Sequence, residues 1–560
     1  MSFGTKPGDD EVLYLPLGGT GEIGMNLNLY GHKGKWLMVD LGISFADHRL
    51  PGVDVIMPDP DFIEQQSENL VGLVLTHAHE DHIGAVPHLW PFLRCPIYAT
   101  PFTRTMVYHK LVEHGLENDV EINVIPVGGR FEVGPFDIEL LSMTHSIPEP
   151  ASLAIRTAVG TVFHSGDWKF DPDPLVGADY DESGLKALGE EGVLAMISDS
   201  TNVMSEREAG SEATVREGLT DVIAGCTGRV AVTCFASNVA RVESVIRAAE
   251  ACDRRVLLMG RSMHRIYQAA RDNGYLENMP PLASEEEFEY LSPDQVVILC
   301  TGSQGEPRSA TARLSRNEFR SVWLDEGDTV VFSSRVIPGN ETAVYSLQNN
   351  FSKIGVEVIT DREAPVHVSG HPSRDEVMAL YDMIKPAIAV PTHGEARHLR
   401  EHAKVAALSG TSQQIIAGNG DLIRFTKTGK AEKIDSITAG TLAVESGRLV
   451  ETGSAILKDR QKMSFNGAAT VTVVLDEAGD LLDTPMLSLR GLIEIDEEFD
   501  IFEEAVDAVK DALKRLRKGE RQKDSLIEET ARIAVRRYFN KVFNKKPVTD
   551  VHVVRIAEEG

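Results

Sequence analysis

The amino-acid sequence predicts a multidomain α/β protein, and three observations support this fold class. The chain has 560 residues, whereas a single hydrophobic core stops growing beyond about 250–300 residues. Short apolar segments of strand type alternate with helical segments, as they do in layered α/β domains. The composition is that of a globular protein, with 42% hydrophobic and 25% charged residues. We therefore expect two or three α/β domains.

The first predicted domain combines short strands with intervening helices. Apolar segments bounded by turn residues predict strands, and apolar positions at helical spacing predict helices. The predicted strands are 11–17, 26–30, 35–40, 71–76, 138–143 and 161–164, and the predicted helices are 83–93 and 104–114. A later strand at 387–390 again ends at a ligand-type residue, His393. We therefore assign residues 1–212 and 362–455 to one split domain.

Between these two halves the pattern changes to longer units of helix and strand. Helices are predicted at 213–224, 239–251 and 263–273, and strands at 229–234, 255–259, 296–300 and 329–333. This alternation is typical of parallel β-α-β units, so residues 213–361 form an inserted domain.

The remaining residues, 456–560, are assigned to a linker around 458–466 and a small α/β domain. The predicted strands of that domain are 469–475, 487–495 and 550–556, and its predicted helices are 498–518 and 524–543.

The net charge of −29 argues against attraction of nucleic acid to the whole surface, because phosphate binding depends on clustered lysine and arginine. Any nucleic-acid site must therefore be local. Residues 229–272 are rich in arginine and net basic, which predicts such a patch. A second basic stretch, residues 510–546, is interpreted as solvated helix faces.

Cysteine usage and the apolar segments indicate the cellular location. The five cysteines lack the CxxC spacing, so neither a disulfide framework nor a thiolate zinc site is predicted. Residues 1–10 are polar, and no run approaches the roughly 18 apolar residues of a membrane span. We expect a cytoplasmic protein that does not contact a membrane.

The segment 77–82 reads His-Ala-His-Glu-Asp-His and directly follows an apolar predicted strand. Divalent-metal hydrolases need imidazoles and carboxylates that converge and leave a coordination position open for water. Residues i and i+2 of an extended loop point the same way. His77 and His79 can therefore bind one ion while Asp81 and His82 reach a second. The segment predicts a two-metal hydrolase.

Three further candidates lie at the ends of other predicted strands, where active sites of α/β sheets gather. They are His145, Asp167 and His393. Each is, by itself, more typical of an ordinary loop residue than of a ligand. Together with the segment 77–82, they complete a metal site.

The order of these seven residues resembles the metallo-beta-lactamase superfamily, whose fold is a four-layered αββα sandwich with metals at one edge. The resemblance implies two ions with Asp167 as their bridge. One ion would be held by His77, His79 and His145, and the other by Asp81, His82 and His393. Imidazole ligands favour zinc, and the carboxylates leave manganese or magnesium as alternatives.

The large insertion resembles the beta-CASP branch of nucleases. Three sequence motifs that flank the insertion carry this resemblance: Ser-Asp-Ser-Thr-Asn at 198–202, His-Val-Ser-Gly-His at 367–371, and Pro-Thr-His-Gly-Glu at 391–395. Asp199 matches the first motif of that branch, His371 the second and His393 the third. Across nearly the whole chain, the sequence is most similar to the bacterial ribonuclease J family.

The same resemblance implies a pocket for a nucleotide phosphate. Its residues would be Ala236, Ser237 and Asn238 together with His367, Val368, Ser369, Gly370 and His371. Hydroxyl and backbone N–H groups near a helix start suit an anion. Taken alone, the segment 236–238 is better explained as the N-cap of a helix that starts at Val239.

The resemblance further implies cleavage of single-stranded RNA, both internally and from the 5′ end with a preference for a 5′ monophosphate, in rRNA processing and mRNA decay. Our mechanistic hypothesis is in-line attack by a water that two metal ions activate. Asp81 would orient that water and accept its proton. His371, in a catalytic group with Asp199, would stabilise the transition state or protonate the leaving oxygen.

Three alternatives remain open. A DNA-directed nuclease of the same branch has no distinguishing short motif. A hydrolase of small thioesters or lactams would not need the insertion. An inactive scaffold of an RNA-degrading assembly should lack some of the seven ligands. We also expect a homodimer or homotetramer, with other RNA-degradation proteins as candidate partners.

Overall fold

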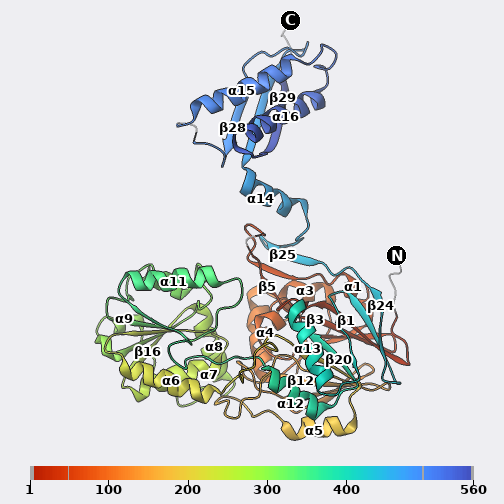
Figure 1. Ribbon diagram of the computed structural model, residues 1–560, viewed down its shortest axis with the longest axis vertical. Helices are drawn as coiled ribbons and strands as arrows, with labels where there is room; N and C mark the ends of the chain where they lie inside the picture. The colour runs from red at the N-terminus through yellow and green to blue at the C-terminus, as the bar shows by residue number, and fades with distance from the viewer. Residues whose placement is uncertain (1–5, 48, 495–496, 557–560) are drawn as a thin grey trace. The chain divides into compact units, whose positions relative to one another are not determined.

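A computed structural model describes residues 6–47, 49–494 and 497–556 (Figure 1). The chain divides into two compact units, one comprising Met1–Ser44 and Met57–Gly440 and the other comprising Phe45–Ile56 and Thr441–Gly560. None of the helices in the described ranges combines the length and the apolar character needed to cross a membrane.

Two large sheets form the centre of the first unit. The first sheet has the strand order β24-β23-β1-β3-β4-β7-β8-β9, and the second has the order β10-β11-β12-β13-β14-β20-β22. The strands of the first are β1 (Glu11–Gly18), β3 (Leu27–His32), β4 (Lys35–Val39), β7 (Leu70–Val74), β8 (Ile97–Ala99), β9 (Ile122–Val124), β23 (Asp421–Thr426) and β24 (Ala431–Ser436). Those of the second are β10 (Arg130–Val133), β11 (Phe136–Ser142), β12 (Ala151–Arg156), β13 (Thr161–His164), β14 (Ala195–Asp199), β20 (Ile388–Thr392) and β22 (Gln413–Gln414).

The two sheets pack face to face and helices cover their outer faces. Leu37 and Val39 of β4 share one apolar core with Leu153 of β12. The alternate residues of β4, such as Trp36, are also fully buried, as expected for a strand covered on both faces. Trp36 packs edge to face on Phe62 of the short helix α1 (Asp61–Glu64).

A second core lies on the other side of the second sheet. It joins that sheet to the helices α5 (Glu182–Glu191), α12 (Arg374–Ile384) and α13 (Ala396–Leu408). The predicted αββα sandwich is thereby confirmed, and its second sheet is completed by β20, which follows the insertion.

The insertion contains a five-stranded sheet of order β16-β17-β15-β18-β19, in which all pairs are parallel. Its strands are β15 (Val230–Thr233), β16 (Arg255–Met259), β17 (Val296–Cys300), β18 (Thr329–Phe332) and β19 (Glu357–Ile359). The helices are α6 (Glu212–Gly225), α7 (Val239–Ala251), α8 (Arg261–Asp272), α9 (Glu285–Phe288), α10 (Ala310–Leu314) and α11 (Glu341–Lys353). In Figure 1, α6 and α11 lie on opposite sides of this sheet.

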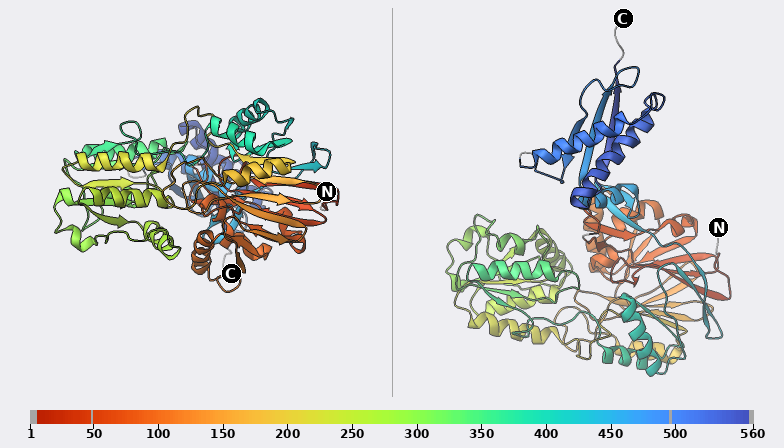
Figure 2. Two further views of the ribbon diagram at one scale, coloured as in Figure 1. Left: turned by 90° about the horizontal axis from the view of Figure 1, so that it is seen from below. Right: turned by 45° about the horizontal axis from the view of Figure 1, so that its top comes forward.

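The second unit contains a three-stranded sheet of order β28-β27-β29. Its strands are β27 (Ala468–Leu475), β28 (Met486–Arg490) and β29 (Val548–Arg555), and its helices are α15 (Phe499–Lys514) and α16 (Asp524–Phe543). Burial alternates along β27, because both helices cover the same face of the sheet (Figure 2). The predicted strand 487–495 ends earlier, at Arg490, and its last residue lies outside the described ranges.

The segment 458–466, predicted as a linker, is part of the helix α14 (Ala455–Asn466). Leu457 of this helix packs with Val53 and Ala443, and Arg460 forms ion pairs with Glu445 at 2.6 and 2.7 Å. Most residues of a small sheet of order β26-β25-β6-β5, which the sequence patterns did not predict, also belong to the second unit. Its strands are β5 (Ser44–Phe45), β6 (Val55–Pro58), β25 (Thr441–Glu445) and β26 (Arg448–Glu451).

Candidate metal centre

Five strand ends bring the candidate ligands to one edge of the sandwich. His77 follows β7, His145 follows β11, and Asp167 follows β13. Asp199 ends β14, and His393 follows β20 directly. Because β13, β14 and β20 are neighbouring parallel strands, their carboxyl ends meet at the same edge.

Three histidines form the first group of ligand atoms. Nδ1 of His79 lies 3.0 Å from Nε2 of His77 and 3.0 Å from Nε2 of His145. Asp167 Oδ2 lies 3.9 Å from both of the latter nitrogen atoms. These four groups are close enough together to hold one ion.

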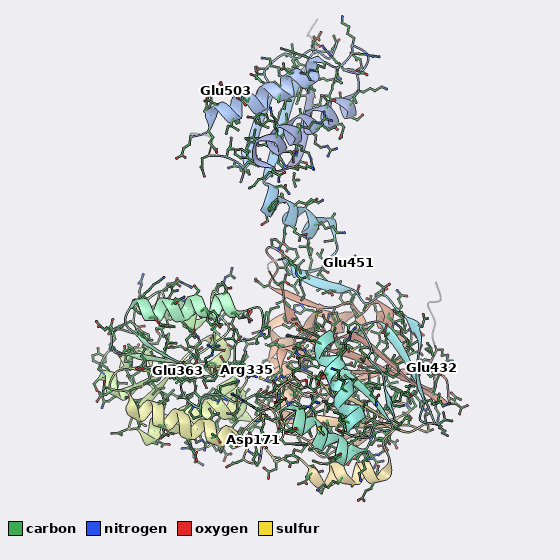
Figure 3. The ribbon with its side chains drawn as sticks, viewed as in Figure 1. Asp171, Arg335, Glu363, Glu432, Glu451 and Glu503 are labelled. Atoms are coloured by element: carbon green, nitrogen blue, oxygen red, sulfur yellow. The ribbon has the colours of Figure 1, made fainter. Side chains whose placement is uncertain are left out.

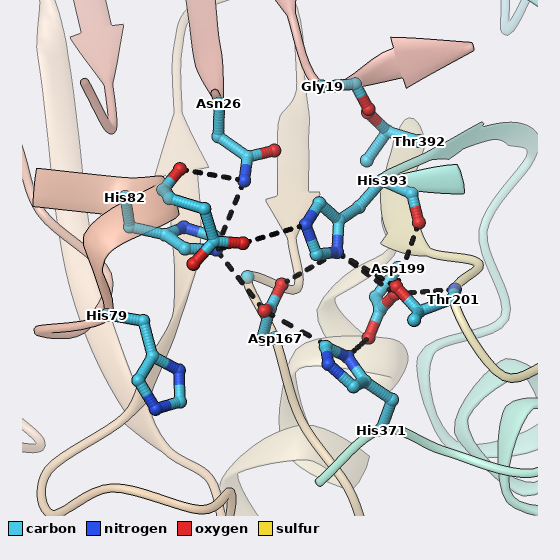
Figure 4. Close-up of polar contacts among 12 residues, drawn as sticks. Gly19, Asn26, His79, His82, Asp167, Asp199, Thr201, His371, Thr392 and His393 are labelled. Atoms are coloured by element: carbon cyan, nitrogen blue, oxygen red, sulfur yellow. Dashed lines mark hydrogen bonds and ion pairs between the residues drawn. The ribbon is translucent and has the colours of Figure 1, made fainter. Parts of the chain in front are cut away.

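Asp167 also belongs to a second group of potential ligands, with Asp81, His82 and His393. Its carboxylate lies 3.2 Å from His82 Nε2 and 3.2 Å from His393 Nδ1. Asp81 Oδ2 faces His393 Nε2 at 3.2 Å and His82 Nε2 at 3.6 Å. Figure 4 shows Asp167 in the middle of this arrangement.

The pKa directions suit metal binding by the first group. Burial lowers the pKa of His77 and His145 well below 6.5 and lowers that of His79 to about 4. These imidazoles are therefore neutral at pH 7, the form that binds a metal.

The second group carries more charge. The imidazoles of His393 and His82 hold the pKa of the Asp167 carboxyl well below 3.8. In turn, carboxylates, first among them that of Asp167, raise the pKa of His82 and His393 well above 6.5. Burial acts in the opposite direction on all three groups and is outweighed. A divalent cation could replace those protons beside the same carboxylates. The donor set therefore fits divalent metal ions.

The buried Asp40, which sequence reasoning missed, orients the second group. Its carboxylate lies 2.7 Å from His82 Nδ1 and accepts hydrogen bonds from the Thr76 amide at 2.8 Å and the Thr76 hydroxyl at 2.9 Å. The Thr76 hydroxyl also lies 3.0 Å from His77 Nδ1. Such contacts fix which ring nitrogen faces the metal. Asp40 follows β4 directly. The same criterion, a polar residue at the end of a strand, could therefore have identified Asp40 from the sequence.

His393 adopts a backbone conformation that is uncommon for a side chain of its size, with φ of 47°. Its amide donates to Gly19 O at 2.7 Å, and the Thr201 hydroxyl lies 3.0 Å from both His393 Nδ1 and His393 O. These contacts stabilise a strained turn that directs the ring into the cluster. Thr201 was not among the predicted site residues.

Asp199 and His371 form a pair beside the cluster. His371 Nδ1 lies 2.7 Å from Asp199 Oδ2 and 3.9 Å from Asp167 Oδ2. Burial would lower the pKa of His371, but Asp199 and Asp167 outweigh it and raise that pKa above 6.5. The pair can therefore hold a proton next to the metal ligands.

The segment 367–371 lies against the first group of ligands. The Gly370 carbonyl accepts a hydrogen bond from His145 Nδ1 at 2.5 Å, and a Cβ on Gly370 would lie 2.9 Å from the His145 ring. Only glycine allows this approach. The Ser369 hydroxyl accepts a hydrogen bond from the His371 amide at 3.0 Å, which fixes the turn.

His367 is half-buried, but its Nδ1 atom is buried and has no hydrogen-bond partner among the described residues. Burial, followed by the charges of Arg241, Arg335 and Lys169, lowers its pKa well below 6.5. A buried unpaired nitrogen is costly, and nearby cations suit an anion. Val368 lies between His367 and the Ser369 turn, against Gly210.

The second predicted phosphate-binding segment, 236–238, begins the helix α7. The Asn238 side chain accepts from the Arg241 amide at 2.9 Å and donates to Glu212 at 3.1 Å. The N-cap interpretation of Asn238 is confirmed, and its side chain is already engaged. Ala236 and Ser237 precede it, and the Arg241 guanidinium donates to Val366 O at 3.3 Å, next to His367.

The arginine-rich stretch 229–272 is not a free basic patch. Arg241 is buried in an ion pair with Glu212, and Arg254 donates to backbone carbonyls. The other ion pairs join Arg229 to Asp328, Arg247 to Glu250, Arg255 to Glu287 and Arg265 to Glu113. The prediction of a local nucleic-acid patch is therefore wrong for the buried Arg241 and Arg254, and it stays a prediction for the exposed and half-exposed arginines of this stretch.

Four family models match consecutive parts of the chain. They are the beta-lactamase superfamily domain at residues 36–185, the ribonuclease J beta-CASP domain at 227–351, the Zn-dependent metallo-hydrolase RNA specificity domain at 355–414 and the ribonuclease J C-terminal domain at 455–556.

Known proteins match over the same length. The chain is 45% identical to a ribonuclease J of Sinorhizobium meliloti over 98% of each chain. It is 37% identical to one of Mycobacterium tuberculosis over 96% of each, and 34% identical to one of Thermus thermophilus over 96% of this chain and 94% of that one. A solved protein of unknown function from Enterococcus faecalis V583 shares the fold, with a TM-score of 0.52, 15% identity and coverage of 74% of this chain and 100% of that one.

Proposed function

Because the chain belongs to the ribonuclease J family, and is thereby a metal-dependent ribonuclease, we propose that it hydrolyses single-stranded RNA by a two-metal mechanism. The observation that carries the proposal is the convergence of seven side chains in two groups that share Asp167. Zinc is the first candidate for both positions, with manganese or magnesium as alternatives.

Divalent ions bound by these residues would lower the pKa of water and neutralise charge on the phosphoryl oxygens. The residues themselves position the reaction. The Asp81 carboxylate, oriented by His393 at 3.2 Å, lies where it can accept a proton from an attacking water. Asp40 and Thr76 keep the ligand rings in one orientation.

His371 is the proposed donor of a proton to the leaving oxygen. Its Nδ1 faces Asp199 at 2.7 Å, which leaves Nε2 free to transfer a proton. The carboxylate of Asp199 favours the protonated ring and fixes its direction, as required of a general acid.

The proposed specificity for a 5′ monophosphate rests on the segments 236–238 and 367–371. His367 offers a buried, unpaired nitrogen close to Arg241 and Lys169. Gly370 contacts the ligand His145 directly, so a phosphate held here would lie at a fixed position relative to the metals. That geometry supports stepwise cleavage from the 5′ end, and internal cleavage would not use the pocket.

One digestion tests the proposal. End-labelled RNA carrying a 5′ monophosphate or a 5′ triphosphate is incubated with added zinc, manganese, magnesium or chelator, and the products are resolved on a gel. We expect metal-dependent cleavage, faster for the monophosphate, and none with His77→Ala. Equal rates for both 5′ ends would refute the pocket, and wild-type activity of His77→Ala would refute the site.

A parallel digestion of single-stranded DNA tests the main alternative, a DNA-directed nuclease. Faster cleavage of DNA than of RNA would favour that alternative. We also propose a cytoplasmic homodimer or homotetramer. All five cysteines are free thiols, which suits a reducing compartment, and light scattering would measure the oligomeric state.

A further inference from the structure

The loop between α15 and α16 carries a net positive charge, although the chain as a whole is strongly negative. Residues 514–523 include six basic residues and one acidic residue, Glu520, whereas the whole chain carries −29. The basic residues are Lys514, Arg515, Arg517, Lys518, Arg521 and Lys523. We call residues 514–523 the cationic loop.

Most of these charges are not neutralised within the protein. All of the basic residues except Arg521 are exposed, and none of those five has an ion-pair partner within residues 6–47, 49–494 and 497–556. Most arginines of residues 229–272, by contrast, are buried or form ion pairs. The two basic stretches therefore differ in how much unpaired positive charge they expose. The interpretation of 510–546 as ordinary solvated faces does not account for this concentration of unpaired charge.

Arg521 gives the cationic loop a defined shape. It is half-buried, forms an ion pair with Asp480, and donates to Leu516 O at 2.9 Å and Lys514 O at 2.8 Å. Gly479, with φ of 84°, approaches so closely that a Cβ would lie 2.6 Å from Arg521 O. The exposed cations therefore project from an ordered support, which reduces the entropy lost on binding.

The helix dipole explains only part of the arrangement. Cations in the last turn of a helix are stabilised by the dipole, which accounts for Lys514 at the end of α15. It does not account for Arg515, Arg517 and Lys518, which lie beyond the helix. The first half of α15 is acidic instead, and Glu503 projects from it into solvent (Figure 3).

The chemistry of the cationic loop fits a polyanion. Leu516 is its only large apolar residue and is half-buried, whereas the centres of protein interfaces are mostly apolar and depleted in lysine. Unpaired lysine and arginine side chains contact phosphate oxygens without reading sequence. The acidic part of α15 would repel the same ligand and direct it to the loop.

We propose that residues 514–523 bind the phosphate backbone of RNA, at a site separate from the metal centre and without sequence preference. The proposal rests on the proposed function, since RNA is the polyanion that such an enzyme meets. Its expected effect is to strengthen the binding of RNA to the enzyme.

The test uses the full chain and single-stranded RNA in chelator, so that binding is measured without cleavage. Fluorescence anisotropy gives Kd across a range of salt concentrations for the parent and for Arg515→Ser/Arg517→Ser/Lys518→Ser. Each phosphate contact contributes about 0.7 to the slope of log affinity against log salt. If all three side chains contact phosphate, the slope should fall by about 2.

Two matched variants test whether the salt dependence comes from the position of these charges or only from the net charge of the protein. Arg515→Lys/Arg517→Lys/Lys518→Arg preserves the charges and should keep the parent slope. Arg537→Ser/Lys541→Ser/Lys546→Ser removes three exposed charges near the other end of α16 and should also keep it. An unchanged slope in the serine variant of the loop, or an equal loss in both serine variants, overturns the proposal.

Two further measurements distinguish the possible failures. At saturating RNA and with metal added, the loop variant should cleave at the rate of the parent. Absence of cleavage by the parent itself would contradict the proposed function, whereas the binding measured in chelator tests the loop. Light scattering without RNA should give the same mass for parent and variant. A changed mass would mean that the loop binds a second copy of the chain and would overturn the RNA proposal.

Discussion

Replacing Asp40 by asparagine should weaken metal binding while leaving the fold intact. Asp40 is fully buried and lies 2.7 Å from His82 Nδ1. A carboxylate in this position holds the proton on Nδ1 and leaves the lone pair of Nε2 facing Asp167 and Asp81, at 3.2 and 3.6 Å. Asparagine has the same shape but offers one acceptor oxygen and an NH₂ group that only donates.

The magnitude follows from the contacts that change. In the parent protein, the Thr76 amide donates a hydrogen bond to Asp40 at 2.8 Å. The asparagine oxygen can still accept this hydrogen bond, which places the NH₂ group opposite His82 Nδ1. The ring would then carry its proton on Nε2 and lose the lone pair that binds metal. Loss of a charge-assisted hydrogen bond costs about 1.5–3 kcal/mol, which corresponds to a roughly 10–150-fold weaker affinity.

Competition with a chromophoric chelator measures the Kd for zinc or manganese. Asp328→Asn is the matched control, because Asp328 is also buried and pairs with Arg229 in the insertion. It should leave the Kd unchanged. If Asp40→Asn binds metal as tightly as the parent, the argument that Asp40 sets the tautomer of His82 is refuted. Thermal unfolding in chelator checks that both variants are folded.

Three further predictions test the catalytic pair, the buried charges and the ligand protonation. His371→Ala should retain its metal and lose about 10²–10⁴-fold in kcat; single-turnover rates at wild-type level would contradict its role. Arg241→Met leaves Glu212 buried without its cation and should lower the free energy of unfolding by about 3–5 kcal/mol; Arg241→Met/Glu212→Leu should recover most of that loss in urea titrations. The pKa values of His82 and His393 are raised above 6.5 in the metal-free protein, so metal displaces protons and affinity rises with pH up to those values. Calorimetry in buffers of different ionisation enthalpy that shows no proton release would refute this last prediction.

The sequence patterns correctly predicted those helices and strands whose apolar residues, at helix or strand spacing, are the ones buried in the folded protein. The helices 239–251 and 524–543 and the strand 255–259 have the predicted bounds. The segment 77–82 was recognisable because its spacing alone directs several ligands to one place. The helix α12 was not predicted, although Ser373 and Glu376 form a capping box at its start.

Features that depend on partners distant in sequence could not be predicted. Arg241 meets Glu212 and Ser333 only after the insertion has folded, so a charge count could not distinguish it from a surface arginine. Similarly, Arg521 and Asp480 form an ion pair although they lie in two different loops of the second unit. Composition gives the sum of charges over a stretch, whereas binding depends on which charges remain unpaired.

The charges at the metal centre explain how so acidic a protein can bind RNA. The carboxylates of Asp40, Asp81, Asp167 and Asp199 lie among the imidazoles of the cluster, and in an acidic chain they would repel a phosphodiester. In the metal-free protein, the protonated imidazoles of His82 and His393 offset part of that negative charge, since their pKa values are raised well above 6.5. Two divalent ions would displace these two protons and leave the centre more positive by about two charges, so bound metal should strengthen its attraction for a phosphodiester. The cationic loop needs no metal for its charge. Metal-free protein should therefore bind RNA chiefly through residues 514–523, and added metal should strengthen binding through the centre.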